Sequence, residues 1–420
     1  MYWPGEGFCM RGSAISQVET PVAYDPQVDS TTDIDAALAP PDAASSAVAR
    51  GGMSTGERIV RLAALIALLY VFLIGIDLLG AGIAGLGGGA ADSLFRGVAN
   101  PVVGLAVGVL ATVLVQSSSV TTATIVALVG AGAVSVPDAV PMIMGANIGT
   151  TVTSTLASLG AIRRTDEFRR AFAGATVHDL FNVLAVVVLL PVEVATGMLS
   201  RIAIALSGAV GVTTGGEFNS PIKNAVGAGA GIFDGVAGVF GGGTATAVVL
   251  MVLGLGMLFA TLIAITRNMR LVIAGAAERS LNAVLERRGS LGLLVGVVIT
   301  VAVQSSSITT ALLVPMMGAG VLTLRNAYPI TLGANVGTTV TALIAALAVP
   351  QIAGLQIALV HLVFNLCGIL LFYPVPALRN IPLRGAEWLA EQATRRRSLV
   401  LAYLVTVFLL VPAGAIFLLG

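Results

Sequence analysis

The chain has 420 residues, of which 56% are hydrophobic and 10% are charged, whereas a soluble globular domain carries about 25% charged residues. A soluble core of this length could not bury so much apolar surface, so the composition predicts an integral membrane protein. The net charge of +1 gives no basic excess for nucleic acid, and the two cysteines, Cys9 in a polar tail and Cys367 in an apolar run, are not expected to pair.

The chain begins with a polar segment and continues as a series of apolar runs. Residues 1–55, rich in Ala, Asp, Ser, Thr and Pro, predict a disordered cytoplasmic tail without the basic and apolar regions of a signal peptide. About 20 apolar residues are needed to cross roughly 30 Å of hydrocarbon. Apolar runs are found at 59–86, 101–136, 137–162, 172–195, 244–265, 291–324, 327–349, 352–373 and 399–419.

Three sequence blocks occur twice in the same order. The first is Gln-Ser-Ser-Ser followed by x-Thr-Thr-Ala, the second is Gly-Ala-Asn-Ile/Val-Gly-Thr-Thr-Val-Thr, and the third is His-x-x-Phe-Asn. The copies begin at residues 116 and 304, 145 and 333, and 178 and 361. Because the first two pairs share one offset of 188 residues and the third has 183, we interpret the chain as an internal duplication.

The basic clusters determine the predicted topology, since Lys and Arg favour the cytoplasmic side. Besides Arg58 and Arg61, such clusters lie at 163–170, 266–288 and 379–397. All can be cytoplasmic if each Gln-Ser-Ser-Ser segment enters the membrane and turns back to its own side, which leaves three full spans per repeat. An odd number of spans inverts the second repeat relative to the first.

We therefore predict an all-α integral membrane protein of two inverted-topology repeats, each with a re-entrant helical hairpin and a broken transmembrane helix. We expect it in the cytoplasmic membrane with a cytoplasmic N-terminus; the span count puts the C-terminus outside unless the last apolar run is re-entrant or interfacial. The predicted parts are the tail 1–55, repeat 1 at 56–195, an external Gly-rich loop at 196–243, repeat 2 at 244–378, and a basic link with a C-terminal apolar helix at 379–420.

The Gln-Ser-Ser-Ser blocks are candidates for an anion site. Such polar clusters within apolar runs must face protein or water. In a hairpin, the second half-helix would begin at the block, and its free N–H groups with the Ser hydroxyls would bind a tetrahedral oxyanion without Arg or Lys. Alternatively, the hydroxyls bond only to helix carbonyls or join helices. The candidates are Gln116, Ser117, Ser118, Ser119, Gln304, Ser305, Ser306 and Ser307.

The Gly-Ala-Asn blocks are candidates for sodium sites. Gly and Asn in the middle of a span favour an unwound stretch, whose carbonyls together with Asn and Thr oxygens suit Na⁺. The alternative is a flexible kink, or close helix packing through Gly145 and Gly149. The candidate side chains are Asn147, Thr150, Thr151, Asn335, Thr338 and Thr339.

The third block places ionisable groups at membrane depth, where a functional role is the first hypothesis. His178 and His361 are twins, but Asp179 is matched by Leu362. One repeat therefore carries an extra negative charge, which suits a cation site added to that half. The alternatives are a structural hydrogen bond for the histidines and a solvated or paired acid for Asp179.

With these blocks assembled, the chain resembles the type II sodium–phosphate cotransporter family over residues 57–415. The most specific segments, besides the doubled Gln-Ser-Ser-Ser, are 141–151, 168–182, 356–361 and 368–374. The short inter-repeat segment departs from the family, because it lacks the cysteines of the animal proteins' large external loop.

The resemblance implies sodium-driven import of inorganic phosphate by alternating access, with phosphate between the two hairpin tips and sodium around the tips and the broken helices. In that family, an acidic residue at the position of Asp179 is found in the members that move net charge, which implies an electrogenic cycle. The resemblance also implies that Asn182 belongs to the same site. The remaining sodium-site candidates are Thr121, Thr122, Asp179, Asn182, Thr309 and Thr310, and the further functional candidates are His178, His361 and Asn365.

Other classes of function remain as alternatives. An intramembrane hydrolase would need one serine activated by one base, which a symmetric duplication does not favour. A channel would lack saturable, gradient-coupled uptake, and a related carrier could move sulfate or arsenate. We expect a transporter and not an enzyme, with Na⁺ as coupling ion, no organic cofactor and no nucleic-acid partner; a homodimer is one of the oligomeric states left open.

Overall fold

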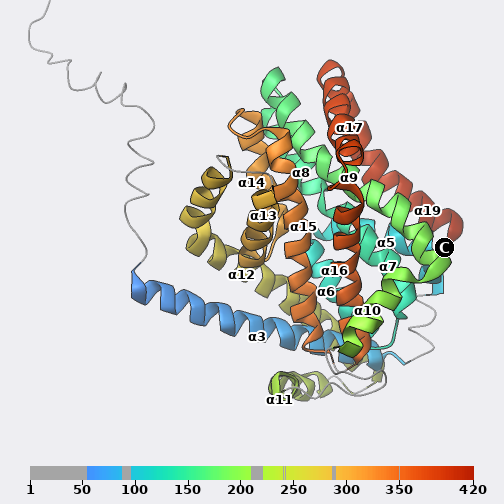
Figure 1. Ribbon diagram of the computed structural model, residues 1–420. Helices are drawn as coiled ribbons and strands as arrows, with labels where there is room; N and C mark the ends of the chain where they lie inside the picture. The colour runs from blue at the N-terminus through green and yellow to red at the C-terminus, as the bar shows by residue number, and fades with distance from the viewer. Residues whose placement is uncertain are drawn as a thin grey trace, which may run out of the picture. The chain divides into compact units, whose positions relative to one another are not determined.

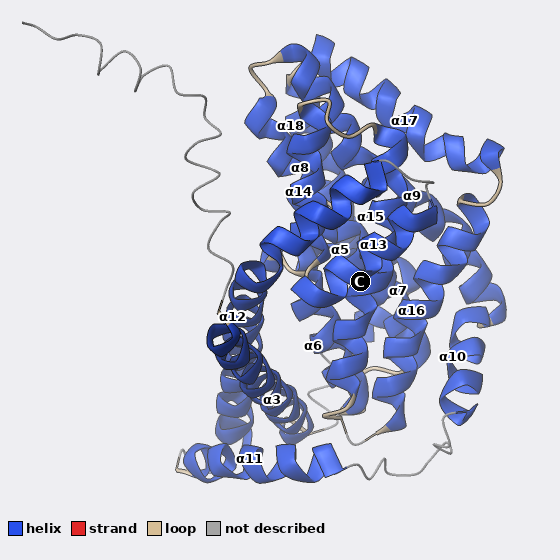
Figure 2. Cartoon of the chain, turned by 60° about the vertical axis from the view of Figure 1, so that its left-hand side comes forward, coloured by secondary structure: helices blue, strands red, loops and turns tan. Residues whose placement is uncertain are grey.

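The computed structural model describes residues 54–87, 96–209, 221–239, 241, 243–285, 290–349 and 351–420. Within these ranges every regular element is a helix (Figures 1 and 2). The tail predicted for residues 1–55 lies outside the described residues except for its last two.

The first half of the chain forms a long helix, α3, two short helices that make a hairpin, α5 and α6, and then α7, α8 and the long helix α9. A serine or asparagine caps several of them: the Ser54 hydroxyl accepts from Glu57 N at the start of α3, and Asn100 Oδ1 accepts from Val102 N at the start of α5. The helices are α3 (Thr55–Gly85), η1 (Arg96–Ala99), α5 (Pro101–Val115), α6 (Ser118–Gly130), α7 (Val136–Thr150), α8 (Val152–Ser158), η2 (Leu159–Ala161) and α9 (Thr165–Thr196).

The second half repeats this order after two connecting helices. The connecting helices are α10 (Met198–Ala209) and α11 (Pro221–Gly238). The helices that follow are α12 (Gly243–Leu285), α13 (Ser290–Val303), α14 (Ser306–Gly318), α15 (Leu324–Ala346), α16 (Ile352–Phe372), α17 (Pro376–Arg395), α18 (Ser398–Val405), the π-helical η3 (Thr406–Leu410) and α19 (Val411–Leu419).

Six helices in the described part of the chain are long and apolar enough to cross a membrane, judged by length and composition. They are Thr55–Gly85, Thr165–Thr196, Gly243–Met269, Leu324–Ala346, Ile352–Phe372 and Ser398–Leu419. The expectation of an all-α membrane protein is confirmed.

Each Gln-Ser-Ser-Ser block forms the sharp turn between two short helices. Gln116 (φ 55°) and Gln304 (φ 56°) are the only non-glycine residues with positive φ in the described ranges. The serine after each glutamine caps the next helix: the Ser117 hydroxyl accepts from Val120 N at 3.3 Å, and the Ser305 hydroxyl accepts from Ile308 N at 3.4 Å. A left-handed backbone costs a residue with a Cβ about 1–2 kcal/mol, and such strain tends to persist at functional sites. The inverted orientation of the two repeats and the re-entrant path of these hairpins stay predictions.

The first arm of each hairpin packs backbone to backbone against the next long helix. A Cβ on Gly145 of α7 would collide with the Leu105 carbonyl of α5, and one on Gly333 of α15 would collide with the Leu293 carbonyl of α13. The two contacts have the same 188-residue offset as the sequence blocks. Because only a glycine allows this approach, the glycines of the Gly-Ala-Asn blocks serve close helix packing.

One sequence prediction about backbone form is wrong. The Gly-Ala-Asn blocks are not unwound: α15 runs through Leu324–Ala346 without a break, and in the first half the only interruption is Thr151, which keeps φ −78° and ψ −17°. The glycines allow close helix packing and do not interrupt the helix, so the backbone hydrogen bonds of α15 are kept. The described part of the inter-repeat segment 196–243 contains two helices, α10 and α11, and neither is among those long and apolar enough to span a membrane. That this segment is an external connection between the repeats stays a prediction.

The two halves interlock around the hairpins. The second arm α6 packs on α15 and α16 of the other half, and α14 packs in the same way on α8 and α9. The helices α10 and α17 continue this exchange by packing on α16 and α9. Figure 2 shows α3 and α12 side by side at one side of the helices that carry the hairpins. The second arm α6 is therefore buried almost throughout, whereas α14 packs one face on the other half and leaves Leu312 and Pro315 exposed.

Candidate substrate and ion site

The two hairpin tips share one cavity of about 350 Å³. Six of the eight residues predicted to bind an anion line it, three from each tip, and Thr153 of α8 joins them. One wall belongs to α12. The tip residues are Gln116, Ser117, Ser119, Gln304, Ser305 and Ser307, and the α12 residues are Phe259, Leu262, Ile263, Thr266 and Arg267.

Both glutamine side chains are fixed in the same way. The Gln116 amide nitrogen donates to the Val113 carbonyl, and its oxygen accepts from the Thr153 hydroxyl at 3.3 Å. The Gln304 amide nitrogen donates to the Val301 carbonyl at 2.6 Å, and its oxygen accepts from the Thr341 hydroxyl at 3.0 Å. Each tip is thus attached to the last threonine of its own Gly-Ala-Asn block, Thr153 or Thr341.

The tips are also joined to each other. The Ser119 hydroxyl donates to the Gln304 carbonyl at 3.3 Å, across 185 positions in sequence. The middle serines, Ser118 and Ser306, are buried and do not line the cavity, and the Ser306 hydroxyl has no hydrogen-bond partner among the described residues. The cavity is therefore built from the first, second and fourth residues of each block.

The electrostatics of the cavity favour an anion. The helices α6 and α14 begin at the two tips, and the N-terminus of a helix carries about half a positive charge. Arg267 is the only charged residue among those that line the cavity. Sequence analysis placed Arg267 in a basic link, because the apolar run ends at residue 265; α12 continues through it and brings it to the cavity wall. Its position two residues after an apolar run is the signal that could have shown this.

A chain of buried hydrogen bonds connects the predicted sodium residues of the two halves. His178 Nε2 lies 2.6 Å from Asn335 Oδ1, and Asn335 Nδ2 donates to Asn182 Oδ1 at 2.7 Å. Asn182 Nδ2 donates in turn to the Asn147 carbonyl at 2.8 Å. The chain joins α9 to α15 and to α7, so the His-x-x-Phe-Asn block of the first half meets both Gly-Ala-Asn blocks.

The predicted threonines mostly use their hydroxyl protons within their own helices. Each donates to a carbonyl three or four residues earlier, which is the structural alternative considered for these residues. The donors are Thr121, Thr122, Thr150, Thr151, Thr309, Thr310, Thr338 and Thr339. A hydroxyl oxygen retains lone pairs after donating, so these bonds leave each threonine able to accept from a donor or to coordinate a cation.

Asp179 makes contacts different from those of Asn182. It is 1% exposed, and its Oδ2 accepts from the Tyr403 hydroxyl at 2.9 Å and from the Thr155 hydroxyl at 3.3 Å. Its Oδ1 has no hydrogen-bond partner among the described residues. The structure therefore does not join Asp179 and Asn182 in one hydrogen-bonded set. Tyr403 was not among the predicted site residues, since it lies 224 positions from Asp179, in the last apolar run.

Helix α8 reaches three of these places through consecutive residues. Thr153 donates to Gln116 of the first tip, the Ser154 hydroxyl donates to Thr310 of α14 at 2.7 Å, and Thr155 donates to Asp179. Successive residues of a helix point in different directions, which lets one short helix contact the tip, the other hairpin and the acid.

The remaining candidates, His361 and Asn365, lie apart from the cavity lining. Asn365 Nδ2 donates to the His361 carbonyl at 2.9 Å within α16, and both residues are 1% exposed. His361 Nδ1 and Asn365 Oδ1 have no partner among the described residues. The ranges that the structure describes contain no cluster of three or more His, Cys, Asp or Glu side chains that could hold a metal ion.

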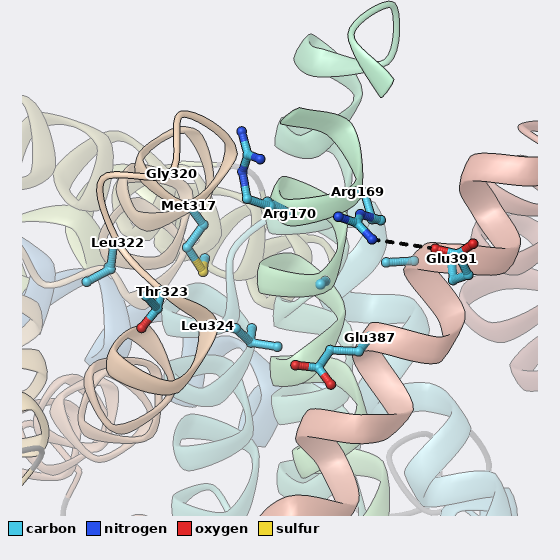
Figure 3. A pocket seen from close by; sticks show the side chains of 11 residues that line it. Arg169, Arg170, Met317, Gly320, Leu322, Thr323, Leu324, Glu387 and Glu391 are labelled. Carbon is cyan, nitrogen blue, oxygen red and sulfur yellow. Dashed lines mark ion pairs between the residues drawn. The ribbon is translucent and has the colours of Figure 1, made fainter. Parts of the chain in front are cut away.

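A second cavity, of about 540 Å³, lies between α9, the α14–α15 connection and α17. Figure 3 shows Arg169 directed toward Glu391 of α17 and Arg170 directed away from that pair. The ion pair between Arg169 and Glu391 has a distance of 3.8 Å. The Nε and Nη2 nitrogens of Arg170 both donate to the Gly318 carbonyl, at 2.9 and 2.6 Å respectively. None of the predicted site residues lines this cavity. It lies where α17 packs against α9.

Comparison with known proteins decides the family. The family model described as Na⁺/Pi-cotransporter matches residues 71–190 and 257–373, one segment in each half. The chain belongs to the Na⁺/Pi-cotransporter family. The two segments of the Na⁺/Pi-cotransporter match contain both tips, both Gly-Ala-Asn blocks and both His-x-x-Phe-Asn blocks.

Among curated relatives, sodium-dependent phosphate transport protein 2A of Ovis aries is 33% identical over 85% of this chain and 67% of its own length. The Mus musculus protein 2A is 34% identical over the same shares, and sodium-dependent phosphate transport protein 2B of Homo sapiens is 34% identical over 85% of this chain and 65% of its own length. No solved structure matches the chain. The resemblance to Na⁺/Pi-cotransporters stated from the sequence is confirmed.

Proposed function

We propose that this multi-pass membrane protein imports inorganic phosphate together with sodium, by alternating access. One observation carries the proposal: two Gln-Ser-Ser-Ser tips from different halves of the chain line one cavity whose only charged lining residue is Arg267. Membership of the Na⁺/Pi-cotransporter family and relatives named for sodium-dependent phosphate transport support it.

Phosphate binds between the tips. The N-termini of α6 and α14 supply about half a positive charge each, and Arg267 supplies a full one, which together balance a divalent anion. The hydroxyls of Ser307 and of the capping serines Ser117 and Ser305 line the cavity and can donate to the phosphate oxygens. The Ser119 hydroxyl also lines the cavity, and it donates to phosphate when it gives up its bond to the Gln304 carbonyl. The proposal adds Arg267 to the site, whereas the sequence-based hypothesis used no cationic side chain.

Sodium binds near Asp179 and along the buried asparagine chain. Asp179 has an unpartnered carboxylate oxygen in a buried place, and no cationic side chain pairs with it among the described residues. An unpaired buried charge is costly, so a transported cation is the natural partner of this acid. Its charge makes the cycle electrogenic. The protein lies in the cytoplasmic membrane with its N-terminus inside.

The buried histidines do not support a hydrolase. A serine nucleophile needs a base within hydrogen-bond reach, but His178 Nε2 is engaged with Asn335, and no tip serine bonds to either histidine in the described ranges. His178 is better explained as part of the polar connection between the halves.

Uptake of radiolabelled phosphate into proteoliposomes tests the proposal. An inward sodium gradient is compared with an equal potassium gradient, with protein-free liposomes as the control. Phosphate accumulation above equilibrium with sodium alone is expected. Equal accumulation with both cations would contradict sodium coupling, and no uptake above the protein-free control would contradict phosphate transport.

A further inference from the structure

The last apolar segment of the chain reaches the acid at the predicted sodium site. Tyr403 on α18 donates its hydroxyl proton to Asp179 Oδ2 at 2.9 Å. The Na⁺/Pi-cotransporter match ends at residue 373, so Tyr403 lies outside the doubled core. We propose that Tyr403 is a positioning residue for sodium binding, which holds the Asp179 carboxylate so that Oδ1 faces the transported cation. The inference rests on the proposed function.

The hydrogen bonds of Asp179 are unevenly distributed. A carboxylate offers about four lone-pair positions on two oxygens. Both donors, Tyr403 and Thr155, approach Oδ2, although Thr155 shares its one hydroxyl proton with the Thr151 carbonyl; Oδ1 has no partner among the described residues. Two donors on one oxygen fix the plane and direction of the carboxylate. They leave the other oxygen for a ligand that is not part of the protein.

The Tyr403 hydroxyl is itself held by aromatic packing. Its ring meets Phe172 of α9 edge-on, with centroids 6.5 Å apart at 77°, and Phe408 in the same manner, at 6.0 Å and 89°. Phe408 belongs to the π-helical turn Thr406–Leu410, and such turns frequently occur at functional sites. Because two rings clamp the phenol, its hydroxyl has little freedom to leave Asp179.

A phenol suits this role better than a basic side chain would. A Lys or Arg in its place would neutralise Asp179 and compete with Na⁺. The Tyr403 hydroxyl stabilises and directs the carboxylate without contributing a charge, so the negative charge remains for the cation. The C-terminal helix thus completes a site whose acid belongs to the first half of the core.

The test compares sodium and phosphate dependence in the Tyr403→Phe variant. This change keeps the ring between Phe172 and Phe408 and removes only the hydroxyl. We expect the half-saturating sodium concentration for phosphate uptake to rise roughly fivefold to tenfold, since hydrogen bonds to charged groups are among the stronger ones. Half-saturating phosphate at saturating sodium should stay within about twofold of wild type. Thr155→Val, which removes the other donor, should shift sodium dependence in the same direction.

Tyr70→Phe is the matched control. It also loses a phenol hydrogen bond, of 2.8 Å to the Ala225 carbonyl, far from Asp179 in sequence, and it should leave sodium dependence unchanged. In an Asp179→Asn background, Tyr403→Phe should have little further effect on sodium dependence, as coupled residues do in a double-mutant cycle.

Three outcomes overturn the positioning role: unchanged or lower half-saturating sodium in Tyr403→Phe, an equal shift in half-saturating phosphate, or a shift that persists in Asp179→Asn. Absence of sodium-dependent uptake in the wild type would instead contradict the proposed function.

Discussion

Replacing Arg267 by Gln removes the one full positive charge from the cavity wall and should weaken phosphate binding. An anion centred in a cavity of about 350 Å³ lies on the order of 6 Å from a guanidinium in its wall. Two unit charges at that separation attract by about 1.4 kcal/mol at an effective dielectric constant of about 40, a value chosen because Arg267 is exposed to solvent. This energy corresponds to roughly a tenfold change in affinity.

The assay is the phosphate-concentration dependence of sodium-driven uptake. Arg267→Gln should raise half-saturating phosphate roughly tenfold, with a larger effect for the divalent than for the monovalent anion, and leave half-saturating sodium within about twofold. Arg267→Lys should retain most of the affinity, since the charge is kept.

Arg61→Gln is the matched control for Arg267. Arg61 is at the same level of the neighbouring helix, where its carbonyl accepts from Asn268 Nδ2 at 2.8 Å, but it does not line the cavity. Unchanged half-saturating phosphate in Arg267→Gln, or an equal rise in Arg61→Gln, would refute the assignment of Arg267 to the substrate cavity.

The remaining predictions concern the tips, the acid and the helix packing. Ser119→Ala removes a hydroxyl from the cavity and the bond between the tips, so half-saturating phosphate should rise roughly fivefold, more than for Ser118→Ala; equal effects in uptake kinetics would contradict this assignment. Asp179→Gly should reduce or abolish the phosphate-evoked current while some uptake remains, and an unchanged current would argue against its role. Gly145→Ala forces a methyl group into the α5 backbone and should destabilise the protein by roughly 1–3 kcal/mol, seen as a lower melting temperature in detergent; Gly160→Ala, with open space around its Cβ position, is the control and should melt like wild type.

The hairpin tips could be predicted because their signal is local and duplicated. Gln116 and Gln304 each stand before a Ser that can cap a helix, within apolar sequence that makes the polar cluster costly elsewhere. A turn followed by a capped helix is specified by these few residues. That both tips face one cavity follows from the packing of the two halves, which the constant offset of the blocks only suggested.

Other features depended on contacts that no local pattern encodes. A Gly-Ala-Asn block has the same sequence whether its glycines unwind a helix or let another backbone approach. Only the position of Leu105 beside Gly145 distinguishes the two. Tyr403 is one aromatic residue among many in apolar runs, and nothing near it in sequence points to Asp179. Arg267 was obscured by the basic residues that follow it.

The arrangement of α8 has a consequence for energy coupling. Three consecutive residues of this seven-residue helix contact a hairpin tip, the opposite hairpin and Asp179. A rigid helix turn cannot shift one of these contacts without displacing the others. If sodium binds at the acid and phosphate between the tips, as proposed, their occupancies are linked equilibria. Linkage is reciprocal: if sodium raises the affinity for phosphate by some factor, phosphate raises the affinity for sodium by the same factor. In such a carrier neither solute is preferentially carried alone, and the steepness of the sodium gradient sets how far phosphate can be concentrated.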